Sequence, residues 1–173
     1  MELAFMDWIQ NILKSPVMDT FMIYFTTLGD KGILYYIILV LLLINKKTRK
    51  IGIVMGIAMI FNFLISNLAL KPLIARPRPF HINTAVEILI HKPSSYSFPS
   101  GHSAQAFAVA GAFLFMNYHY AKPMLIFASL MAFSRVYLYV HYPSDVLAGA
   151  VIGLLCGYLA YRIFHLILQK KEA

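Results

Sequence analysis

Charged residues are scarce in this sequence of 173 residues, and that scarcity excludes an ordinary soluble domain. Only 13% of the residues are charged, whereas soluble globular domains carry about 25%. Acidic residues are the rarer kind, seven against 15 lysines and arginines, so the formal net charge is +8. The basic residues gather at the ends of apolar runs, as expected next to anionic lipid headgroups, and not along one soluble face. We therefore expect a bilayer as the partner and no nucleic acid.

Cysteine is almost absent, which excludes a disulfide framework and a cysteine-based metal site. The single cysteine, Cys156, lies within an apolar run, where we expect a small residue facing lipid or another helix. Hydrophobic residues make up 60% of the chain and come in long blocks that a small soluble core could not bury. The sequence thus predicts an all-α, polytopic membrane helix bundle, with residues 1–173 forming a single domain.

Five apolar runs predict membrane spans. The run at residues 51–70 is uncharged, and at 1.5 Å per residue it crosses a hydrocarbon core of about 30 Å. Glycines four residues apart, Gly149, Gly153 and Gly157, favour close approach of helix backbones within one chain or between chains, so the oligomeric state stays open. The five predicted spans cover residues 32–44, 51–70, 101–118, 124–140 and 146–168.

Residues 1–30 do not form a clean apolar run. Apolar side chains alternate there with Glu2, Asp7 and Lys14, and Pro16 interrupts the helical pattern. This composition predicts a pair of amphipathic helices lying at the membrane interface. An alternative is one irregular span over residues 17–44, and a sixth span in this region also stays open.

Positive charge is almost equally divided between the two sides of the predicted bundle, eight lysines and arginines against seven. The side opposite the C-terminal tail carries seven lysines and arginines. Three of these, Lys71, Arg78 and Arg135, belong to motifs that suit an anion. Without these three, four remain against eight, so the positive-inside rule predicts a cytoplasmic tail and an outward-facing loop at residues 71–99. The eight on the tail side are Lys46, Lys47, Arg49, Lys50, Lys122, Arg162, Lys170 and Lys171.

Three cations lie within eight residues, from Lys71 through Arg76 to Arg78, among three prolines. Proline restricts the backbone, so the charges are preset around an anion. Arginine offers a planar fork that matches phosphate oxygens, and lysine offers a point charge. The pattern favours phosphate binding by Lys71 and Arg78, although Lys71 or Arg76 taken alone would indicate a headgroup contact.

The segment Pro99-Ser100-Gly101-His102 begins the third predicted span. Ser100 is a favoured N-cap, Gly101 permits another group to approach the backbone, and free N–H groups at a helix N-terminus bind anions. Capping does not explain His102, a histidine in the first turn of a lipid-embedded helix. We therefore predict that His102 has a functional role.

Arg135, His141 and Asp145 form a third cluster at the same side of the membrane. An arginine near the end of an apolar span requires an acidic partner or a bound phosphate. A carboxylate near a histidine can accept its ring N–H and fix its tautomer. Two histidines and an aspartate could instead ligate a metal, but the nearby cations would repel a divalent ion and suit a phosphoryl group. We expect neither a metal nor a cofactor.

Together these motifs resemble the type 2 phosphatidic acid phosphatase family, in its short bacterial form, within the superfamily that also includes vanadium haloperoxidases. The family signature is Lys-x6-Arg-Pro, Pro-Ser-Gly-His and Ser-Arg-x5-His-x3-Asp, and residues 71–145 match it at every position. The resemblance implies that His141 is the nucleophile, that Asp145 orients it, and that His102 is the general acid and then the base. It also implies metal-independent catalysis with the phosphoryl group bound by Lys71, Arg78, Ser100, Gly101 and Arg135.

The expected function is a lipid phosphatase in the bacterial cytoplasmic membrane, with its active site facing the extracytoplasmic side. Undecaprenyl diphosphate is the favoured substrate, and phosphatidylglycerol phosphate, phosphatidate and lipid A phosphates are alternatives. A non-catalytic lipid-phosphate binding or transport protein is the alternative class, since it would need the cations but neither His102 nor the His141–Asp145 pair. Residues 80–98, with His91 and Lys92, are expected at the mouth of the pocket.

Overall fold

The computed structural model describes residues 1–172 and the side chains of residues 1–170, so the side chain of Lys171 lies outside the described residues. Within this range every helix or strand that can be assigned is a helix, which confirms the all-α class. The helices are α1 (Glu2–Leu13), α2 (Pro16–Thr27), α3 (Ile33–Ile44), α4 (Arg49–Asn62), α5 (Lys71–Ile74), α6 (Pro79–Ile82), α7 (Gly101–Phe115), α8 (Ala121–Tyr137) and α9 (Pro143–Glu172), with η1 (Asp30–Gly32) and η2 (Phe63–Leu70) between them.

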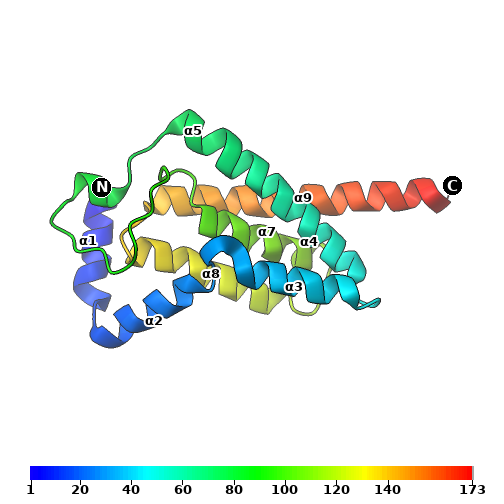
Figure 1. The fold of residues 1–173 in the computed structure, drawn as a ribbon, viewed down its shortest axis with the longest axis horizontal. Helices are drawn as coiled ribbons and strands as arrows, with labels where there is room; N and C mark the ends of the chain where they lie inside the picture. Colours follow the sequence, from blue (N-terminus) through cyan, green and yellow to red (C-terminus); the bar gives the residue numbers. More distant parts are fainter. Residues whose placement is uncertain (173) are drawn as a thin grey trace.

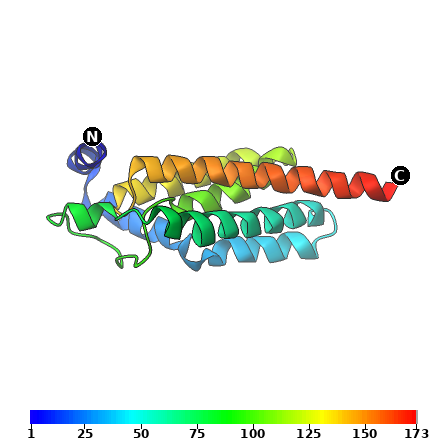
Figure 2. The ribbon, with the colours of Figure 1, turned by 90° about the horizontal axis from the view of Figure 1, so that it is seen from above.

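The long helices run side by side along one axis, and α1 lies across one end of them (Figure 1). Helix α7 is central, because it packs against α4, α8 and α9, while α3 packs on α4. The view from above shows the same elongated bundle, with the C-terminal part of α9 extending beyond the other helices (Figure 2). The two chain ends thus lie at opposite ends of the molecule.

Two helices are long and apolar enough by themselves to cross a membrane, Arg49–Ile82 and Pro143–Lys170. Pro16–Thr27 and Asp30–Ile44 meet at a bend of 41° and qualify only as a pair, which matches the alternative of one irregular span in this region. Helices α7 and α8 have 15 and 17 residues, about 22 and 25 Å at the standard rise, which is short of a full hydrocarbon core. By length the structure therefore has two or three candidate spans, and the count of five stays a prediction.

Small residues line the buried face of α7, and large aliphatic residues are exposed on α3 and α9. The buried face of α7 includes Ala104, Ala108 and Ala112, while exposed isoleucine, leucine and valine side chains cover α3 and α9. A water-soluble bundle places its large aliphatic side chains inside, whereas a membrane bundle packs through small ones. The described surface of α3 and α9 therefore fits a lipid environment.

Helices α7 and α9 approach each other through glycines, as the four-residue spacing predicted. A Cβ atom on Gly149 would lie 2.7 Å from the carbonyl oxygen of Ser100, and one on Gly157 would lie 2.8 Å from the Cα of Gly111. Backbone atoms cannot move aside as a flexible side chain can, so these positions require glycine. The contact lies within one chain and brings the start of α9 beside the start of α7.

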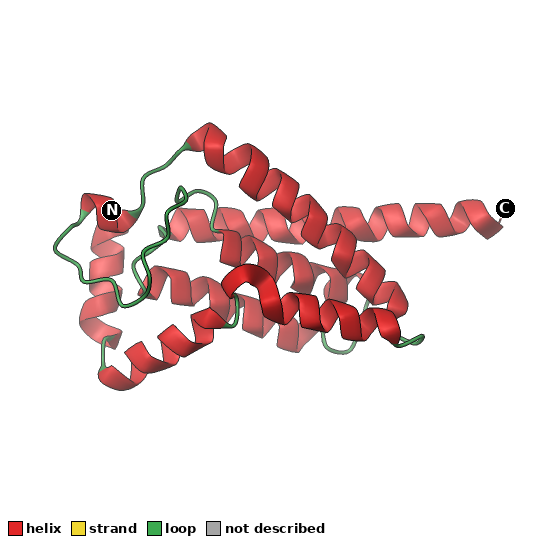
Figure 3. Cartoon of the chain, in the orientation of Figure 1, coloured by secondary structure: helices red, strands yellow, loops and turns green. Residues whose placement is uncertain are grey.

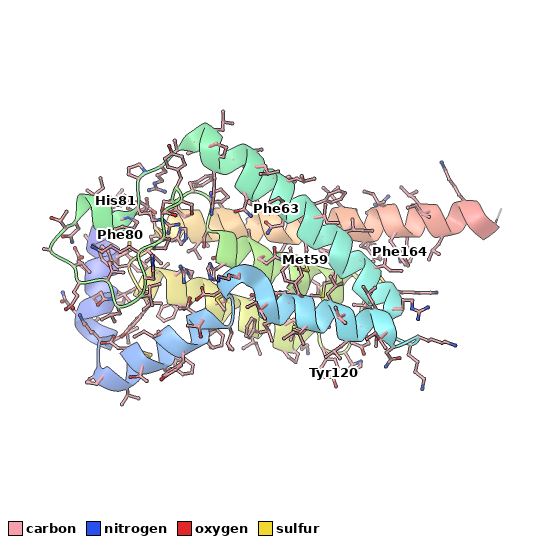
Figure 4. All side chains as sticks on the ribbon, viewed as in Figure 1. Met59, Phe63, Phe80, His81, Tyr120 and Phe164 are labelled. Carbon is pink, nitrogen blue, oxygen red and sulfur yellow. The ribbon has the colours of Figure 1, made fainter. Side chains whose placement is uncertain are left out.

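The segment between α5 and α7 folds back over the end of the bundle where α1 lies. It contains α6 and long stretches of loop, drawn in green in Figure 3. Ala75, with φ 45°, ends α5 in the left-handed conformation and redirects the chain. Phe80 and His81 lie at this end and Tyr120 at the opposite one (Figure 4).

Candidate active site

Six of the eight predicted site residues line one cavity of about 560 Å³ at the end of the bundle next to α1. They come from five places in the fold: the start of α5, the loop after it, the start of α7, the last turn of α8 and the turn before α9. Ser100 and Asp145 lie behind the cavity wall and are fully buried. The six that line the cavity are Lys71, Arg78, Gly101, His102, Arg135 and His141.

Arg78 is buried, with 2% of its surface exposed, and only neutral groups hydrogen bond to it. Its Nε donates to the Ser95 carbonyl oxygen at 2.7 Å, and one Nη donates to the Val140 carbonyl oxygen at 2.8 Å. The same Nη lies 3.2 Å from Nε2 of His141. These contacts fix the guanidinium beside His141 without neutralising it, so its charge remains available to an anion.

Arg135 is equally buried and also lacks a hydrogen-bonded carboxylate among the described residues. One Nη donates to the hydroxyl of Thr26 on α2, and Nε has no partner in the described part of the chain. A buried cation without a counter-charge is costly, and an anion bound in the cavity would compensate it. The geometry therefore points to Arg135 as part of an anion site.

Lys71 and Gly101 meet on another wall of the cavity. The ammonium of Lys71 lies 3.4 Å from Oγ of Ser95 and would lie 3.4 Å from a Cβ on Gly101. The missing side chain at Gly101 thus leaves the N-terminus of α7 accessible next to a positive charge. Free N–H groups there add to the attraction for an anion.

Ser100 has a structural position, and its side chain does not line the cavity. Its Oγ accepts from the backbone N–H of Ser103 at 3.5 Å and from the Ser103 hydroxyl at 2.9 Å, so it caps α7. Its backbone N–H donates to the carbonyl oxygen of Asp145 at 3.0 Å. Ser100 therefore links the starts of α7 and α9, and direct phosphoryl binding by its hydroxyl stays a prediction.

His141 lies in the turn between α8 and α9, with its two ring nitrogens in different surroundings. Nδ1 is 3.6 Å from Oδ2 of Asp145, and Nε2 is beside Arg78. Burial lowers the pKa of His141, and the nearby Arg78 and Arg135 lower it further, while Asp145 opposes them. The ring is therefore neutral at physiological pH. With the proton on Nδ1 facing the carboxylate, the lone pair of Nε2 is the nucleophilic one.

The carboxylate of Asp145 is held by three hydrogen-bond donors besides its contact with His141. Oδ2 accepts from the hydroxyl of Ser97 at 2.5 Å and from the backbone N–H of Tyr142 at 3.0 Å. Oδ1 accepts from Arg76 at 2.6 Å, and the carboxylate is completely buried. Such a saturated carboxylate is ionised and fixed in orientation.

His102, at the start of α7, contacts a residue that sequence reasoning missed. Its Nε2 lies 3.0 Å from Oδ1 of Asp30, in the bend between α2 and α3. The two residues are 72 positions apart, and no spacing links them. The cavity therefore contains two histidine–aspartate pairs, and the sequence indicated only one.

Arg76 is the second residue that was missed, and here the sequence offered a signal. It lies between Lys71 and Arg78, in the proline-rich motif, but alone it indicated a headgroup contact. In the structure its two Nη atoms bind Asp145 at 2.6 Å and Glu2 at 2.7 Å. Arg76 thus forms ion pairs with two carboxylates and does not line the cavity.

A second cavity of about 350 Å³ adjoins the first and shares Lys71, Gly101 and His102 with it. It extends between α3 and the helix formed by α4 and η2, where Tyr36, Met59 and Phe63 line it. Met59 and Phe63 mark this helix in Figure 4. The site therefore adjoins a second cavity whose lining is mixed, with these apolar side chains beside Lys31, Asn67 and Gln105.

This arrangement suits transfer of a phosphoryl group. A neutral imidazole faces three cations that no carboxylate neutralises by a hydrogen bond within the described residues, and a second imidazole faces the same cavity. Phosphoryl transfer depends mainly on positioning and on cations that stabilise the transferring group. Within the described residues no cluster of three histidine, cysteine or acidic side chains could hold a metal ion.

Comparisons with known proteins agree with this chemistry. The family model described as "PAP2 superfamily" matches residues 47–168. Undecaprenyl-diphosphatase BcrC of Bacillus subtilis is 33% identical over 153 residues, which cover 88% of this chain and 78% of that protein. Lipid A 4'-phosphatase of Bacteroides thetaiotaomicron is also 33% identical, over 94% of this chain and 77% of that protein.

Two solved structures share the fold. The structure of LpxE from Aquifex aeolicus has a TM-score of 0.81 and 29% identity, and the match covers 93% of this chain and 94% of that one. The PAP2-type phosphatidylglycerolphosphate phosphatase of Bacillus subtilis has a TM-score of 0.78 and 29% identity, over 96% and 85% of the two chains. These matches confirm the resemblance inferred from the motifs. The chain belongs to the PAP2 superfamily and is one of its phosphatases.

Proposed function

We propose that this chain removes the terminal phosphate of a lipid diphosphate in the bacterial cytoplasmic membrane, through a phosphohistidine at His141. One observation carries the proposal: Nε2 of His141 lies beside Arg78 at a cavity whose walls hold Lys71, Arg78 and Arg135. A phosphoryl group in this cavity would lie within reach of a nucleophile and of three positive charges at once.

The chemistry proceeds in two displacements. Nε2 of His141 attacks the terminal phosphorus, the P–N bond forms, and the bond from phosphorus to the leaving oxygen breaks while His102 protonates that oxygen. A water molecule then attacks the phosphohistidine and gives its proton to His102. The P–N bond breaks, its electron pair returns to Nε2, and inorganic phosphate leaves. Each histidine ends in its starting protonation state.

Undecaprenyl diphosphate is the substrate that the observations favour. Lys31 and His91 line the cavity in addition to the residues around His141; Lys31 offers a positive charge to a second phosphate, and the His91 ring offers a hydrogen-bonding group. His91 comes from the segment expected at the pocket mouth. Two relatives are named undecaprenyl-diphosphatases, those of Bacillus subtilis and Sulfolobus acidocaldarius. Lipid A phosphates and phosphatidylglycerol phosphate are the alternatives that the remaining relatives suggest, and phosphatidate is the third.

The lipid part of the proposal rests on the side cavity between α3 and α4. Its apolar residues Tyr36, Met59 and Phe63 adjoin Lys71 and His102, so a headgroup in the site could keep its hydrocarbon chain in the bilayer. We propose five membrane crossings: residues 16–44 as one bent span, the helix from Arg49 onward, α7, α8 and α9. The active site then faces the extracytoplasmic side, because the lysine-rich loop at residues 45–50 lies at the other end.

The test is a substrate panel with purified protein in the presence of a metal chelator. Phosphate release from undecaprenyl diphosphate, phosphatidylglycerol phosphate, phosphatidate and lipid A is compared by kcat/KM. We expect the diphosphate to have the highest value. Activity confined to water-soluble phosphates would contradict the lipid assignment, and a higher value for a monophosphate lipid would contradict the diphosphate assignment.

The nucleophile is tested with His141→Ala and His141→Gln, checked for folding by thermal stability. Both should lose phosphate release and the acid-labile phosphoprotein that the wild type forms. His102→Ala should slow turnover by about 10²- to 10⁴-fold, the usual effect of losing a general acid. If His141→Ala released phosphate at the wild-type rate, the phosphohistidine mechanism would be wrong. Binding of the lipid without any phosphate release by the wild type would favour the non-catalytic class.

A further inference from the structure

The N-terminal helix is connected to the active site by a chain of charged contacts that the family signature does not include. Arg76 bridges two carboxylates: one Nη lies 2.6 Å from Asp145 and the other lies 2.7 Å from Glu2 at the start of α1. Glu2 also accepts from the backbone N–H of Ser144 at 2.9 Å. Glu2 thus contacts both Arg76 and the residue preceding Asp145.

Arg76 is placed to act on Asp145 and not on a substrate. The nitrogen that contacts Asp145 also donates to the Ser144 hydroxyl at 2.7 Å, and the guanidinium carbon lies 3.8 Å above the ring of Tyr142. The side chain does not line the cavity. Removing it would leave a completely buried carboxylate without its counter-ion, which proteins tolerate poorly.

Glu2 is ionised, as this role requires. Partial burial would raise its pKa, but hydrogen bonds from Ser144 and Arg76 outweigh burial and hold the pKa below the ordinary value for a glutamate. A carboxylate, a guanidinium and a second carboxylate therefore alternate in charge from α1 to Asp145. His141 follows, with Nδ1 3.6 Å from Asp145.

Helix α1 makes further contacts with the turn that carries His141. Asp7 accepts from the hydroxyl of Tyr139 at 2.6 Å, and the side chain of Gln10 donates to the backbone carbonyl of Tyr137. On the next helix, Asp19 accepts from the hydroxyl of Tyr137 at 2.6 Å. Glu2 and Asp7, two of the polar residues behind the prediction of an interfacial helix, therefore bind the protein, and α1 docks on the end of α8 and on the turn that carries His141.

We propose that Glu2 and Arg76 are a positioning pair for Asp145, so that helix α1 is part of the catalytic apparatus of this enzyme. The proposal rests on the proposed roles of His141 and Asp145. Arg76 sets how strongly the negative charge of Asp145 acts on His141, and Glu2 fixes Arg76 from the other side. The other charged groups facing His141 are Arg78, from the loop after α5, and Arg135, from α8.

The test compares Arg76→Gln with Arg76→Lys in protein carrying a C-terminal tag, using the pH dependence of kcat/KM. Without the guanidinium, the negative charge of Asp145 is less compensated, so the pKa of His141 rises. Because the neutral ring is the nucleophile, the acidic limb of the profile should move to higher pH, by roughly one unit for a charge this close. Arg76→Lys keeps the charge and should return the limb to near its wild-type position.

Glu2→Gln tests the link to α1, and Asp19→Asn is its matched control. Both remove one acidic group of the N-terminal region that accepts a hydrogen bond, but Asp19 contacts neither Arg76 nor Asp145. We expect Glu2→Gln to lower kcat about tenfold with little change in KM, the loss typical of an orienting partner. Asp19→Asn should lower thermal stability and leave kcat near the wild-type value.

Two results would overturn the proposal. One is an acidic limb for Arg76→Gln at the wild-type pH, and the other is an equal effect of Glu2→Gln and Asp19→Asn on kcat. Both are distinct from failure of the proposed function, in which the wild type itself would release no phosphate from any lipid.

Discussion

The two ring nitrogens of His141 divide the chemistry between them. Nδ1 faces Asp145, and Nε2 faces Arg78 and the cavity. Arg78 can donate to Nε2 only when that nitrogen carries a lone pair, so the position of Arg78 favours the tautomer that a nucleophile needs. When a phosphoryl group arrives, the guanidinium can bind its oxygens and free the lone pair.

The pH dependence of the enzyme should reflect the burial of His141. Burial lowers the pKa of this ring, and the neutral form is the proposed nucleophile, so we expect the fraction of active enzyme to stay high as pH falls. We expect the acidic limb of kcat/KM to lie below about pH 6.5, the ordinary value for histidine. The measurement is a pH–rate profile with a substrate whose own ionisation is determined separately. A limb at or above that value that follows His141 would contradict a neutral buried nucleophile.

Asp30 should assist His102, which it contacts at 3.0 Å. A carboxylate beside an imidazole stabilises its protonated form and fixes its orientation. Lys71 lines the same cavity, and its charge acts in the opposite direction. Asp30→Asn should therefore lower kcat about tenfold, as loss of an orienting partner does elsewhere, with a smaller change in KM, and Asp30→Glu should recover part of the rate. A wild-type kcat for Asp30→Asn would show that the contact is incidental.

At the scale of the helices, the close contact of α7 and α9 determines where Asp145 lies relative to Gly101 and His102. Gly149 meets α7 at Ser100, directly beside the site, whereas Gly157 meets it at Gly111, about three turns further along α7. A backbone hydrogen bond from the N–H of Ser100 to the carbonyl oxygen of Asp145 joins the starts of the two helices. The same glycine stripe thus sets both the packing of the bundle and the geometry of the site.

Replacing Gly149 or Gly157 by alanine should distinguish an effect on stability from an effect on activity. Each added methyl group would meet backbone atoms closer than 3 Å, and overpacking of this kind costs about 1–3 kcal/mol. Gly149→Ala and Gly157→Ala should both lower the melting temperature in detergent. Only Gly149→Ala should also reduce kcat/KM strongly, because it displaces Ser100.

Leu155→Ala is the control for these two variants. Leu155 lies on α9 between the two glycines and is 54% exposed. Its replacement by alanine should therefore change the melting temperature and kcat/KM little. Equal loss of activity in Gly149→Ala and Gly157→Ala would show that the local displacement of Ser100 does not matter.

At the scale of the whole molecule, the two ends of the bundle differ in kind. One end carries α1 and the long loop, and the other carries the basic loop at residues 45–50 and the end of α9 (Figure 1). The cavity opens near the first of these ends. Exposed aliphatic residues lie between them. The proposed orientation follows from this polarity and from the positive-inside rule.

Orientation can be measured by cysteine labelling in intact cells. The single native cysteine, Cys156, is buried, so it should contribute little background. Glu87→Cys lies in the exposed loop at the cavity end and Lys47→Cys in the exposed basic loop. We expect a membrane-impermeant maleimide to label Glu87→Cys directly and Lys47→Cys only after permeabilisation. The reverse pattern would place the active site in the cytoplasm.

Much of the site was predictable because the signature residues are close together in sequence or lie at helix ends. Lys71, Arg78, Gly101, His102, Arg135 and His141 were all predicted and all line one cavity. Ser100 was predicted as a phosphate ligand; in the structure its hydroxyl caps α7 behind the wall, and phosphate binding by this hydroxyl stays a prediction. The sequence could not show whether the Ser100 hydroxyl caps the helix or binds an anion, because both roles require a hydroxyl at the start of a helix.

The composition and the apolar runs of the sequence were sufficient to determine an all-α chain adapted to lipid, and the motifs were sufficient to predict residues that line one cavity, since these properties depend on residue type and on near neighbours. The partners of the catalytic residues depended on the tertiary structure. Glu2 reaches Ser144 across 142 positions, and Asp30 reaches His102 across 72. Such contacts arise only when α1 docks across the end of the bundle and when α2 and α3 bend at Asp30. No local spacing encodes them, because the bend and the docking result from the packing of the entire chain.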